Sequence, residues 1–272
     1  MDGIITPVRA PVSYREETVM LSGKTAWITG GGSGIGRAAA EALAQAGAQV
    51  IISGRRPELL SKVVERIVAA GGGAEAEATD VSDPVAAMET AKRVNERHGP
   101  IDILVNSAGF NVPQRRWNDM DNALWDQVIG INLNATRYCI AAVLPAMRAQ
   151  KDGLIINVAA WAGRFVVGRA GAAYTAAKHG VVALTMSLNM EECHSGIRAT
   201  ALCPGEVDTP MHQSRPQAPS AREARRMLQV DDMGRIILFL AETPPHVCFN
   251  EILVTPTFNR ALLGAAESGF VA

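Results

Sequence analysis

The feature that most constrains the fold is a regular alternation of short apolar runs with longer segments of helical periodicity. The apolar runs lie at residues 25–29, 49–53, 101–106, 154–158, 198–202 and 251–254, and a weaker one lies at 74–79. The helical patterns lie between them, at residues 37–46, 57–70, 123–148, 172–193 and 234–241, with a further one after Asp83-Pro84. Strands that alternate with helices of this length form right-handed βαβ units around a parallel sheet. The sequence therefore predicts an α/β fold, a Rossmann-type doubly wound parallel sheet with helices on both faces.

Composition narrows the classes of partner. The 272 residues carry a net charge of −1 with no concentrated basic patch, so nucleic acid is not an expected partner. The chain has no uninterrupted apolar run as long as a membrane span, so none is predicted. The four cysteines are widely spaced and form no C-x-x-C pair, which predicts neither a metal site nor a disulfide framework. We therefore expect a globular protein of the cytoplasm.

The length suits one large domain. Residues 1–20 mix charged side chains and prolines without the apolar stretch of a signal peptide, so we expect a loosely ordered N-terminal arm there. No linker interrupts residues 21–272, which predicts a single Rossmann-fold domain. Its one long irregular stretch is rich in Pro, Gln and Ser, and we expect a lid at about 205–228.

A glycine-rich turn, Thr29-Gly-Gly-Gly-Ser-Gly-Ile-Gly36, separates the first predicted strand from the first helix. Glycines at such a turn let the backbone approach a pyrophosphate, whose oxygens accept hydrogen bonds from the helix N-terminus. The turn therefore predicts a dinucleotide site. Its expected members are Gly30, Gly32, Ser33, Gly34, Ile35 and Gly36.

Five further motifs follow in order along the chain. They are Asp80-Val81, Asn106-Ser-Ala-Gly109, Asn132 in Ile-Asn-Leu, Tyr174-Thr-Ala-Ala-Lys178, and Pro204-Gly205 followed by Val207 and Thr209. Together with the T-G-x-x-x-G-x-G spacing of the turn, they make the chain resemble the short-chain dehydrogenase/reductase family from about residue 21 to about residue 255. The resemblance implies further cofactor contacts at Asp80, Val81, Asn106, Ala108, Gly109, Tyr174, Lys178, Pro204, Gly205, Val207 and Thr209.

The end of the second predicted strand indicates which nicotinamide is bound. An acidic residue there would hydrogen-bond the ribose hydroxyls of NAD, but Gly54 occupies that position and Arg55 and Arg56 follow. A guanidinium presents a planar fork to a phosphate, and we expect no carboxylate nearby to oppose it. We therefore expect NADP(H), with Arg55 as the first residue for the 2′-phosphate and Arg56 as the second; NAD(H) remains the alternative.

Tyr174 and Lys178 are four residues apart on a helical pattern, so they share one face. Carbonyl reduction needs a proton for the new alkoxide, and a tyrosine can supply it near neutral pH if a positive charge lowers its pKa. We expect Lys178 to provide that charge. The resemblance implies that Lys178 also holds the nicotinamide ribose and that Asn132 positions a water in a proton relay.

The catalytic serine of that family has no counterpart here. The segment expected to hold it reads Val158-Ala-Ala-Trp-Ala-Gly163, in which Ala160 aligns with the serine and Trp161 is the alternative alignment. No serine or threonine occurs from Asp152 to Tyr174. The serine hydroxyl would steady the developing oxyanion, a contribution of about 10²–10³ in rate.

Three explanations of Ala160 stay open on sequence alone. The first is a deliberate Ser→Ala replacement in an otherwise intact site. The second is a natural enzyme that is slow or whose substrate brings its own donor. The third is a non-catalytic nucleotide-binding protein with a regulatory role. Because Asn132, Tyr174 and Lys178 all match the family pattern, we favour the first, and we expect an alcohol dehydrogenase or carbonyl reductase with reduced activity.

The resemblance places the substrate near the segments after the fourth and fifth strands and under the lid. The residues expected to line that region are Phe110, Asn111, Trp161, Arg164, Glu206, Met211 and His212. Arg115 or Arg164 could meet a carboxylate or phosphate, whereas His212 is expected to line the site without being a ligand. The C-terminal Asn250-Glu-Ile-Leu-Val-Thr-Pro256 resembles the branch that handles hydroxy acids and related polar alcohols. The resemblance also implies that helices at about 118–149 and 171–195 pair between subunits. Both segments are rich in alanine and leucine here, so we expect a homotetramer or homodimer.

Overall fold

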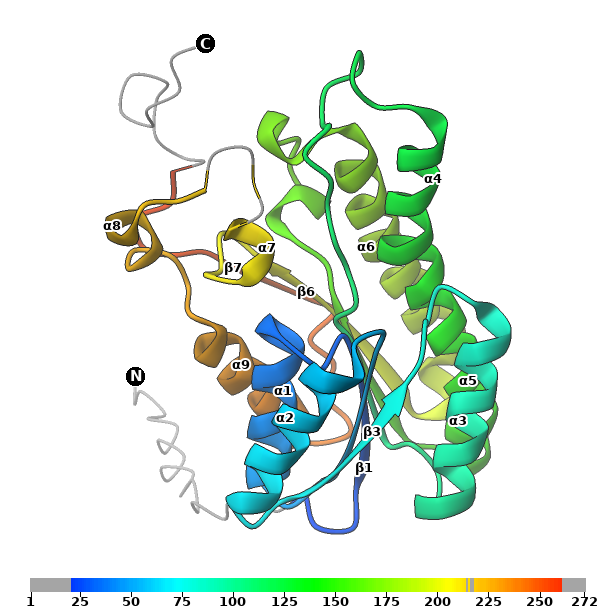
Figure 1. Ribbon diagram of the computed structural model, residues 1–272. Helices are drawn as coiled ribbons and strands as arrows, with labels where there is room; N and C mark the ends of the chain where they lie inside the picture. Colours follow the sequence, from blue (N-terminus) through cyan, green and yellow to red (C-terminus); the bar gives the residue numbers. More distant parts are fainter. Residues whose placement is uncertain (1–20, 214, 216–217, 261–272) are drawn as a thin grey trace, which may run out of the picture.

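Seven strands form one parallel sheet in the order β3-β2-β1-β4-β5-β6-β7. Helices lie on either side of this sheet (Figure 1). The computed structural model describes residues 21–213, 215 and 218–260, so the expected N-terminal arm lies outside the described residues. The strands are β1 (Thr25–Thr29), β2 (Gln49–Gly54), β3 (Gly73–Ala78), β4 (Ile103–Asn106), β5 (Gly153–Val158), β6 (Ile197–Pro204) and β7 (Glu251–Val254). The prediction of a doubly wound parallel sheet is confirmed.

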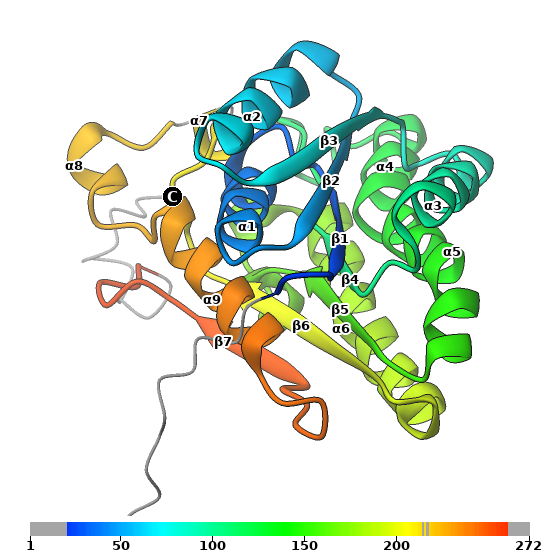
Figure 2. The same ribbon diagram turned by 90° about the horizontal axis from the view of Figure 1, so that it is seen from below.

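Helices cover both faces of this sheet (Figure 2). One layer contains α1 (Gly34–Gln45), α2 (Pro57–Ala69) and α9 (Val230–Glu242). The other contains α3 (Pro84–His98), α4 (Asn122–Ile129), α5 (Ala135–Gln150) and α6 (Ala172–Glu192). Two short helices, α7 (Pro210–Gln213) and α8 (Ala221–Ala224), lie in the segment predicted to be a lid.

The start of several helices follows directly from local chemistry. Pro57 and Pro84 each occupy the first turn of their helix, where the missing N–H has no consequence. The Asp83 carboxylate caps α3 by accepting a hydrogen bond from the Val85 N–H, and Asp121 caps α4 through the Leu124 N–H at 2.8 Å. These caps set where the helices begin relative to the strands.

Successive residues along each central strand pack alternately against the two layers of helices. Trp27, Ile51, Leu104 and Ile155 are in register across β2, β1, β4 and β5 and pack with the α3 and α5 layer. Their neighbours Ile28, Ile52, Val105 and Ile156 pack with α1, α2 and α9. Because both faces are covered, both sets of side chains are buried.

The weakest predicted strand lies at the edge of the sheet as β3. Its alternate residues carry Glu75 and Glu77, and Glu77 pairs with Arg93 of α3 at 3.0 Å. An edge strand has only one neighbour and stays partly exposed, which explains its low apolar content. The chain passes outward from β1 to β3 and returns to place β4 beside β1. Ligands of such sheets bind at the carboxyl ends of the strands beside this reversal.

The predicted helix at 123–148 is interrupted. A π-helical turn, Gly130–Asn134, joins α4 to α5 within one helical segment, Asn122–Gln150. By length and composition alone that segment could cross a membrane. Its buried α5 side chains, among them Cys139, Val143 and Met147, instead belong to the core beneath the sheet, which accounts for its apolar character.

Candidate active site

The glycine-rich turn lies where the backbone leaves no room for side chains. A Cβ at Gly30, whose φ is +68°, would come within 2.9 Å of the Ser107 carbonyl oxygen. A Cβ at Gly36 would overlap the carbonyl oxygen of Gly30. The Thr29 hydroxyl oxygen accepts hydrogen bonds from the N–H groups of Ser107 and Ala108, both at 3.1 Å. The ends of β1 and β4 are thereby fixed together beneath the turn.

The N-terminus of α1 faces outward from this turn without a cap. Ser33 is the N-cap residue in an extended conformation, its side chain makes no capping hydrogen bond, and no acidic residue occupies the described first turn. The first N–H groups of a helix have no partner within the helix, and their partial positive charge favours an anion. The turn and the helix therefore fit the pyrophosphate of a dinucleotide.

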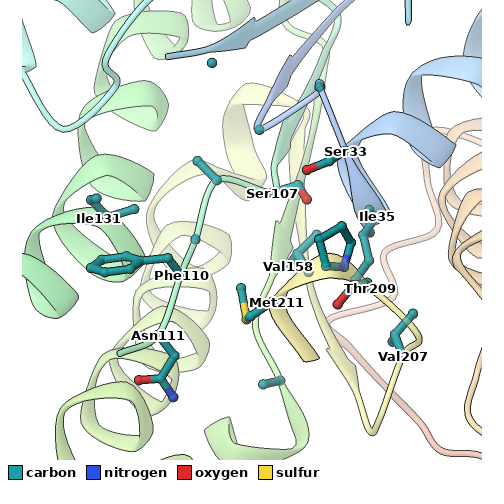
Figure 3. A pocket seen from close by; sticks show the side chains of 18 of the residues that line it. Ser33, Ile35, Ser107, Phe110, Asn111, Ile131, Val158, Val207, Thr209 and Met211 are labelled. Carbon is teal, nitrogen blue, oxygen red and sulfur yellow. The ribbon is translucent and has the colours of Figure 1, made fainter. Parts of the chain in front are cut away.

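A cleft of about 820 Å³ runs from this turn along the carboxyl ends of the strands (Figure 3). Figure 3 shows side chains from the start of α1, the segment after β4 and the lid segment gathered around one space. The predicted cofactor residues that line it are Gly30, Gly32, Ser33, Gly34, Ile35, Arg55, Arg56, Asp80, Val81, Ala108, Gly109, Tyr174, Lys178, Pro204, Gly205, Val207 and Thr209.

Two predicted cofactor residues do not line the cleft. Gly36 lies behind the turn, where it allows α1 to pack against Gly30. Asn106 is buried and its Nδ2 donates a hydrogen bond to the Asn157 Oδ1 at 2.9 Å. Asn157 in turn donates to the Thr185 hydroxyl at 2.9 Å, so this chain of side chains links β4, β5 and α6. Both residues shape the site from beneath rather than facing a ligand.

The expectation of no carboxylate near Arg55 is wrong. Because β2 and β3 are adjacent, the segments after them meet, and the positive charge of Arg55 reaches the carboxylate of Asp80. Burial would raise the pKa of Asp80, but hydrogen bonds from the Ser82 hydroxyl and N–H, and then Arg55, lower it overall. Arg55 and Arg56 are exposed at the rim of the cleft.

Asn132 lies in the π-helical turn between α4 and α5. Its Nδ2 donates to the Phe110 carbonyl at 2.8 Å and to the Val128 carbonyl at 2.9 Å. Its Oδ1 is buried without a hydrogen-bond partner among the described residues, and a Cβ at Gly109 would come within 2.8 Å of it. The turn thus holds a buried polar group beside the cleft, as π-helical turns at functional sites often do.

Tyr174 and Lys178 lie one turn apart on α6 and both line the cleft. The Lys178 Nζ lies 5.7 Å from the centroid of the Tyr174 ring and donates to the Val158 carbonyl at 2.8 Å. Burial lowers the pKa of Lys178 to about 8. Burial raises the pKa of Tyr174 to about 12, and the charges of Arg215 and Arg115 oppose that rise. We expected Lys178 to lower the pKa of Tyr174. Burial instead dominates this pKa, and the cations that oppose the rise are Arg215 and Arg115.

Ala160 lies at the junction of the cleft with a second compartment of about 90 Å³, and it lines both. Tyr174 lines both as well. Among the described residues that line the second compartment, Tyr174 is the only one with a hydroxyl group. The position expected to carry a serine therefore faces the same two spaces as Tyr174 and presents only a methyl group.

The predicted substrate residues divide between these spaces. Phe110 lines the cleft, Trp161 and Glu206 line the second compartment, and Asn111 and Met211 line both. Arg164 is not one of the described residues that line the cleft or the second compartment. Its half-exposed side chain pairs with Glu251 at 3.0 Å, because β7 lies next to β6 and brings that carboxylate within reach. The prediction that Arg164 contacts substrate is not supported by this placement.

The sequence interpretation missed two arginines of the second compartment. Arg169 and Arg215 both line it, together with Arg115. Arg169 and Arg215 come from irregular segments with no recognisable motif, so no local pattern could have singled them out. His212, expected to line the site without being a ligand, lines both spaces.

Comparisons with known proteins agree with this arrangement. The family described as short chain dehydrogenase matches residues 24–220. An uncharacterized oxidoreductase of Staphylococcus saprophyticus is 36% identical over 239 residues, which cover 88% of this chain and 99% of the relative.

Two solved structures are also similar. A metagenomic short-chain oxidoreductase in complex with NADP is 35% identical with a TM-score of 0.77, covering 88% of this chain and 100% of that one. An alcohol dehydrogenase from the archaeon Thermococcus sibiricus, complexed with 5-hydroxy-NADP, is 25% identical with a TM-score of 0.78, covering 87% and 97%.

The fold and the cleft define a dinucleotide-binding oxidoreductase. The chain belongs to the short-chain dehydrogenase/reductase family. The family assignment predicted from the motifs is confirmed, and with it the expectation of an enzyme that binds a nicotinamide dinucleotide and acts on a small molecule.

Proposed function

We propose that this protein is an NADP(H)-dependent oxidoreductase that interconverts a secondary alcohol and its ketone or aldehyde, with Tyr174 as general acid and base. The observation that carries the proposal is that Tyr174 and Lys178 line the same cleft as the glycine-rich turn, with Asn132 buried beside it at Gly109. The residues that fit the dinucleotide and the Tyr174 and Lys178 pair thus share one continuous space.

The nicotinamide supplies or accepts the hydride when it is bound. In the reducing direction Tyr174 donates its hydroxyl proton to the carbonyl oxygen as that oxygen gains negative charge. In the oxidising direction the tyrosinate accepts the alcohol proton. Lys178 carries the positive charge nearest to the Tyr174 ring on α6, and Asn132 offers a buried Oδ1 that can accept a hydrogen bond from a relay water.

Ala160 predicts that this chemistry is slow for ordinary carbonyl substrates. The missing hydroxyl would have donated a hydrogen bond to the same oxygen that receives the Tyr174 proton. Loss of one such donor reduces rates by about 10²–10³. The proposal therefore includes reduced activity, which serine at this position should restore.

The preference for NADP(H) over NAD(H) is proposed from the rim of the cleft. Arg55 and Arg56 line it next to Gly54, and neither is engaged in a buried ion pair. The partial neutralisation of Arg55 by Asp80 weakens the preference without removing it, because Arg56 lies at the same rim. The two similar structures that were solved with NADP or a derivative of it support the same choice.

We also propose that the protein is a homo-oligomer, a tetramer or a dimer, through the α4–α5 and α6 surface. Met186 and Met190 lie one turn apart on α6 with exposed fractions of 52% and 81%. Large apolar side chains in that arrangement suit burial against a second copy. Sedimentation equilibrium tests this, since a monomer at micromolar concentration would contradict it.

The experiment follows NADPH oxidation at 340 nm with a panel of ketones and aldehydes, using the parent chain and Ala160→Ser. We expect slow turnover in the parent and a gain of about 100-fold in the serine variant on at least one substrate. No turnover by either protein, with NADPH still bound, would contradict the proposal. That result would favour the alternative of a non-catalytic nucleotide-binding protein with a regulatory role, which the comparisons do not favour.

A further inference from the structure

Four neighbouring strands are each followed by a segment that contains an arginine, and these arginines gather at the carboxyl ends of the strands. Arg115 follows β4, Arg169 follows β5, Arg215 follows β6 and Arg260 follows β7. The carboxyl ends of parallel strands meet at one edge, so these residues from distant segments gather there. Three of them surround the Glu206 carboxylate, with Arg215 at 2.8 Å, Arg260 at 2.9 Å and Arg169 at 3.5 Å.

The positive charge of this group exceeds its negative charge. Among the described residues, four guanidinium groups accompany two carboxylates, Glu206 and the Glu223 that pairs with Arg260. The Arg169, Arg215 and Arg260 side chains are exposed by only 21%, 17% and 20%. Positive charge held away from water is unfavourable unless an anion accompanies it.

The pKa values within this arginine cluster are consistent with its excess of positive charge. Burial would raise the pKa of Glu206, but hydrogen bonds from Arg260 and Arg215 and the charge of Arg169 lower it to about 2. Burial lowers the pKa of Arg115 and of Arg169. The Glu206 carboxylate opposes that lowering at Arg169, and the charge of Arg215 adds to it at both residues. The carboxylate is thus fully ionised, and the guanidinium groups still repel one another.

The cationic side chains face the reacting region. Arg115, Arg169 and Arg215 line the compartment of about 90 Å³ that Ala160 and Tyr174 also line. Arg115 is held in place by hydrogen bonds from its Nε to the Val112 carbonyl at 2.7 Å and from its Nη1 to the Arg169 carbonyl at 2.8 Å. A guanidinium has five N–H donors, so these two bonds orient Arg115 and leave donors for a ligand.

His212 adds a neutral donor to the same compartment. An Nη2 of Arg215 lies 2.7 Å from the His212 Nε2, and because a guanidinium only donates, that nitrogen accepts. The ring hydrogen is therefore assigned to Nδ1, which is buried without a hydrogen-bond partner among the described residues. Burial, and then the charge of Arg215, lowers the pKa of His212 to about 3, so the ring stays neutral.

We propose that this compartment binds the carboxylate of an oxo-acid or hydroxy-acid substrate through Arg115, Arg215 and the Nδ1–H of His212. The carboxylate would balance the excess charge and hold the reacting carbon beside Tyr174. The volume of about 90 Å³ suits a small anionic group such as a carboxylate, and the continuity with the cleft leaves space for the rest of a short chain. The inference rests on the proposed oxidoreductase function for its statement that the ligand is a substrate.

The first test is binding, which needs no turnover. The chain saturated with NADP⁺, so that the rim arginines are occupied, is titrated calorimetrically with pyruvate, acetoacetate and 4-oxopentanoate, and with the methyl ester of each. We expect at least one acid to bind tenfold or more tightly than its ester. Arg215→Gln should weaken that acid tenfold or more and the ester less than threefold. Arg225→Gln, which removes an exposed arginine of the same lid segment, should leave both unchanged.

Three results would overturn the inference. They are esters that bind as tightly as every acid, inorganic phosphate that binds more tightly than every acid, and equal effects of the two arginine variants. If Arg215→Gln fails to fold by circular dichroism, His212→Phe serves in its place and should weaken the acid but not the ester. Turnover of neutral ketones without any preference for acids would contradict this inference alone. Acid binding without any NADPH oxidation would contradict the proposed function alone.

Discussion

The two ends of the active-site cleft are built in different ways. The cofactor end is formed by the segments that follow β1, β2, β3 and β4, and short motifs such as Gly30–Gly36 define it locally. The substrate end is formed by the segments after β4, β5, β6 and β7, where Arg115, Arg169 and Arg215 come from irregular segments and meet only in the folded chain. The cofactor end can therefore be recognised from residues close in sequence. The opposite end has no such local motif, because its residues come from segments far apart in the sequence.

The largest effect is expected for Tyr174→Phe, which removes the group shared by both ends. Loss of a general acid reduces the rate by about 10²–10⁴, so we expect a decrease of about 1000-fold in kcat on the best substrate. NADPH binding, measured by the fluorescence of the bound cofactor, should stay within threefold of the parent. A variant that keeps a tenth or more of the parent activity would show that another residue transfers the proton.

The second prediction concerns the stability of the substrate end. The pKa of Glu206 is lowered to about 2, so its ionised form stabilises the fold above the ordinary pKa of a glutamate. That stabilisation, on the order of 3 kcal/mol, is lost as the pH falls from about 4.5 toward 2.

Glu206→Gln is therefore expected to be less stable than the parent at pH 7, with a smaller difference at pH 3. Urea unfolding followed by circular dichroism at both pH values measures this. Glu65→Gln, which changes an exposed glutamate of α2, serves as the control and should leave the stability unchanged. A Glu206→Gln variant of parental stability at pH 7 would remove the evidence that the arginine cluster requires a carboxylate.

These two ends also explain how much the sequence could predict. The order of strands and helices, the turn at Gly30 and the pair Tyr174 and Lys178 followed from periodicity and short motifs, since each depends on residues close in sequence. Arg164 was expected at the substrate but pairs with Glu251, and Arg55 has an unexpected neighbour in Asp80. Both differences arise from contacts between segments distant in sequence that the sheet brings together, which no local pattern reports.

The third prediction concerns the protonation of Tyr174. Burial raises its pKa to about 12 despite the charges of Arg215 and Arg115. The ultraviolet difference spectrum of tyrosinate, recorded for the cofactor-free protein and for Tyr174→Phe, should therefore show no ionisation of this side chain up to pH 10. An ionisation near pH 7 that is lost in Tyr174→Phe would mean that cations, and not burial, control this group.

The smallest effect is expected at the rim of the cofactor end. Arg55→Ala should weaken NADP⁺ about tenfold, the loss of one exposed charge-assisted contact to a phosphate, and NAD⁺ less than twofold. Arg66→Ala removes a comparably exposed arginine on the far part of α2 and should change neither cofactor. Equal weakening of NADP⁺ and NAD⁺ by Arg55→Ala would contradict the phosphate assignment.

The most direct test of the account is transfer of deuterium from the cofactor to the product. Ala160→Ser is incubated with NADPH deuterated at the nicotinamide C4, separately in each stereoisomer, and with the substrate that it reduces fastest. Mass spectrometry of the alcohol should show one deuterium from one stereoisomer only, and Tyr174→Phe in the same background should yield almost no alcohol. An alcohol without deuterium from either stereoisomer, or no alcohol from any carbonyl compound tested, would contradict an active site built for hydride and proton transfer.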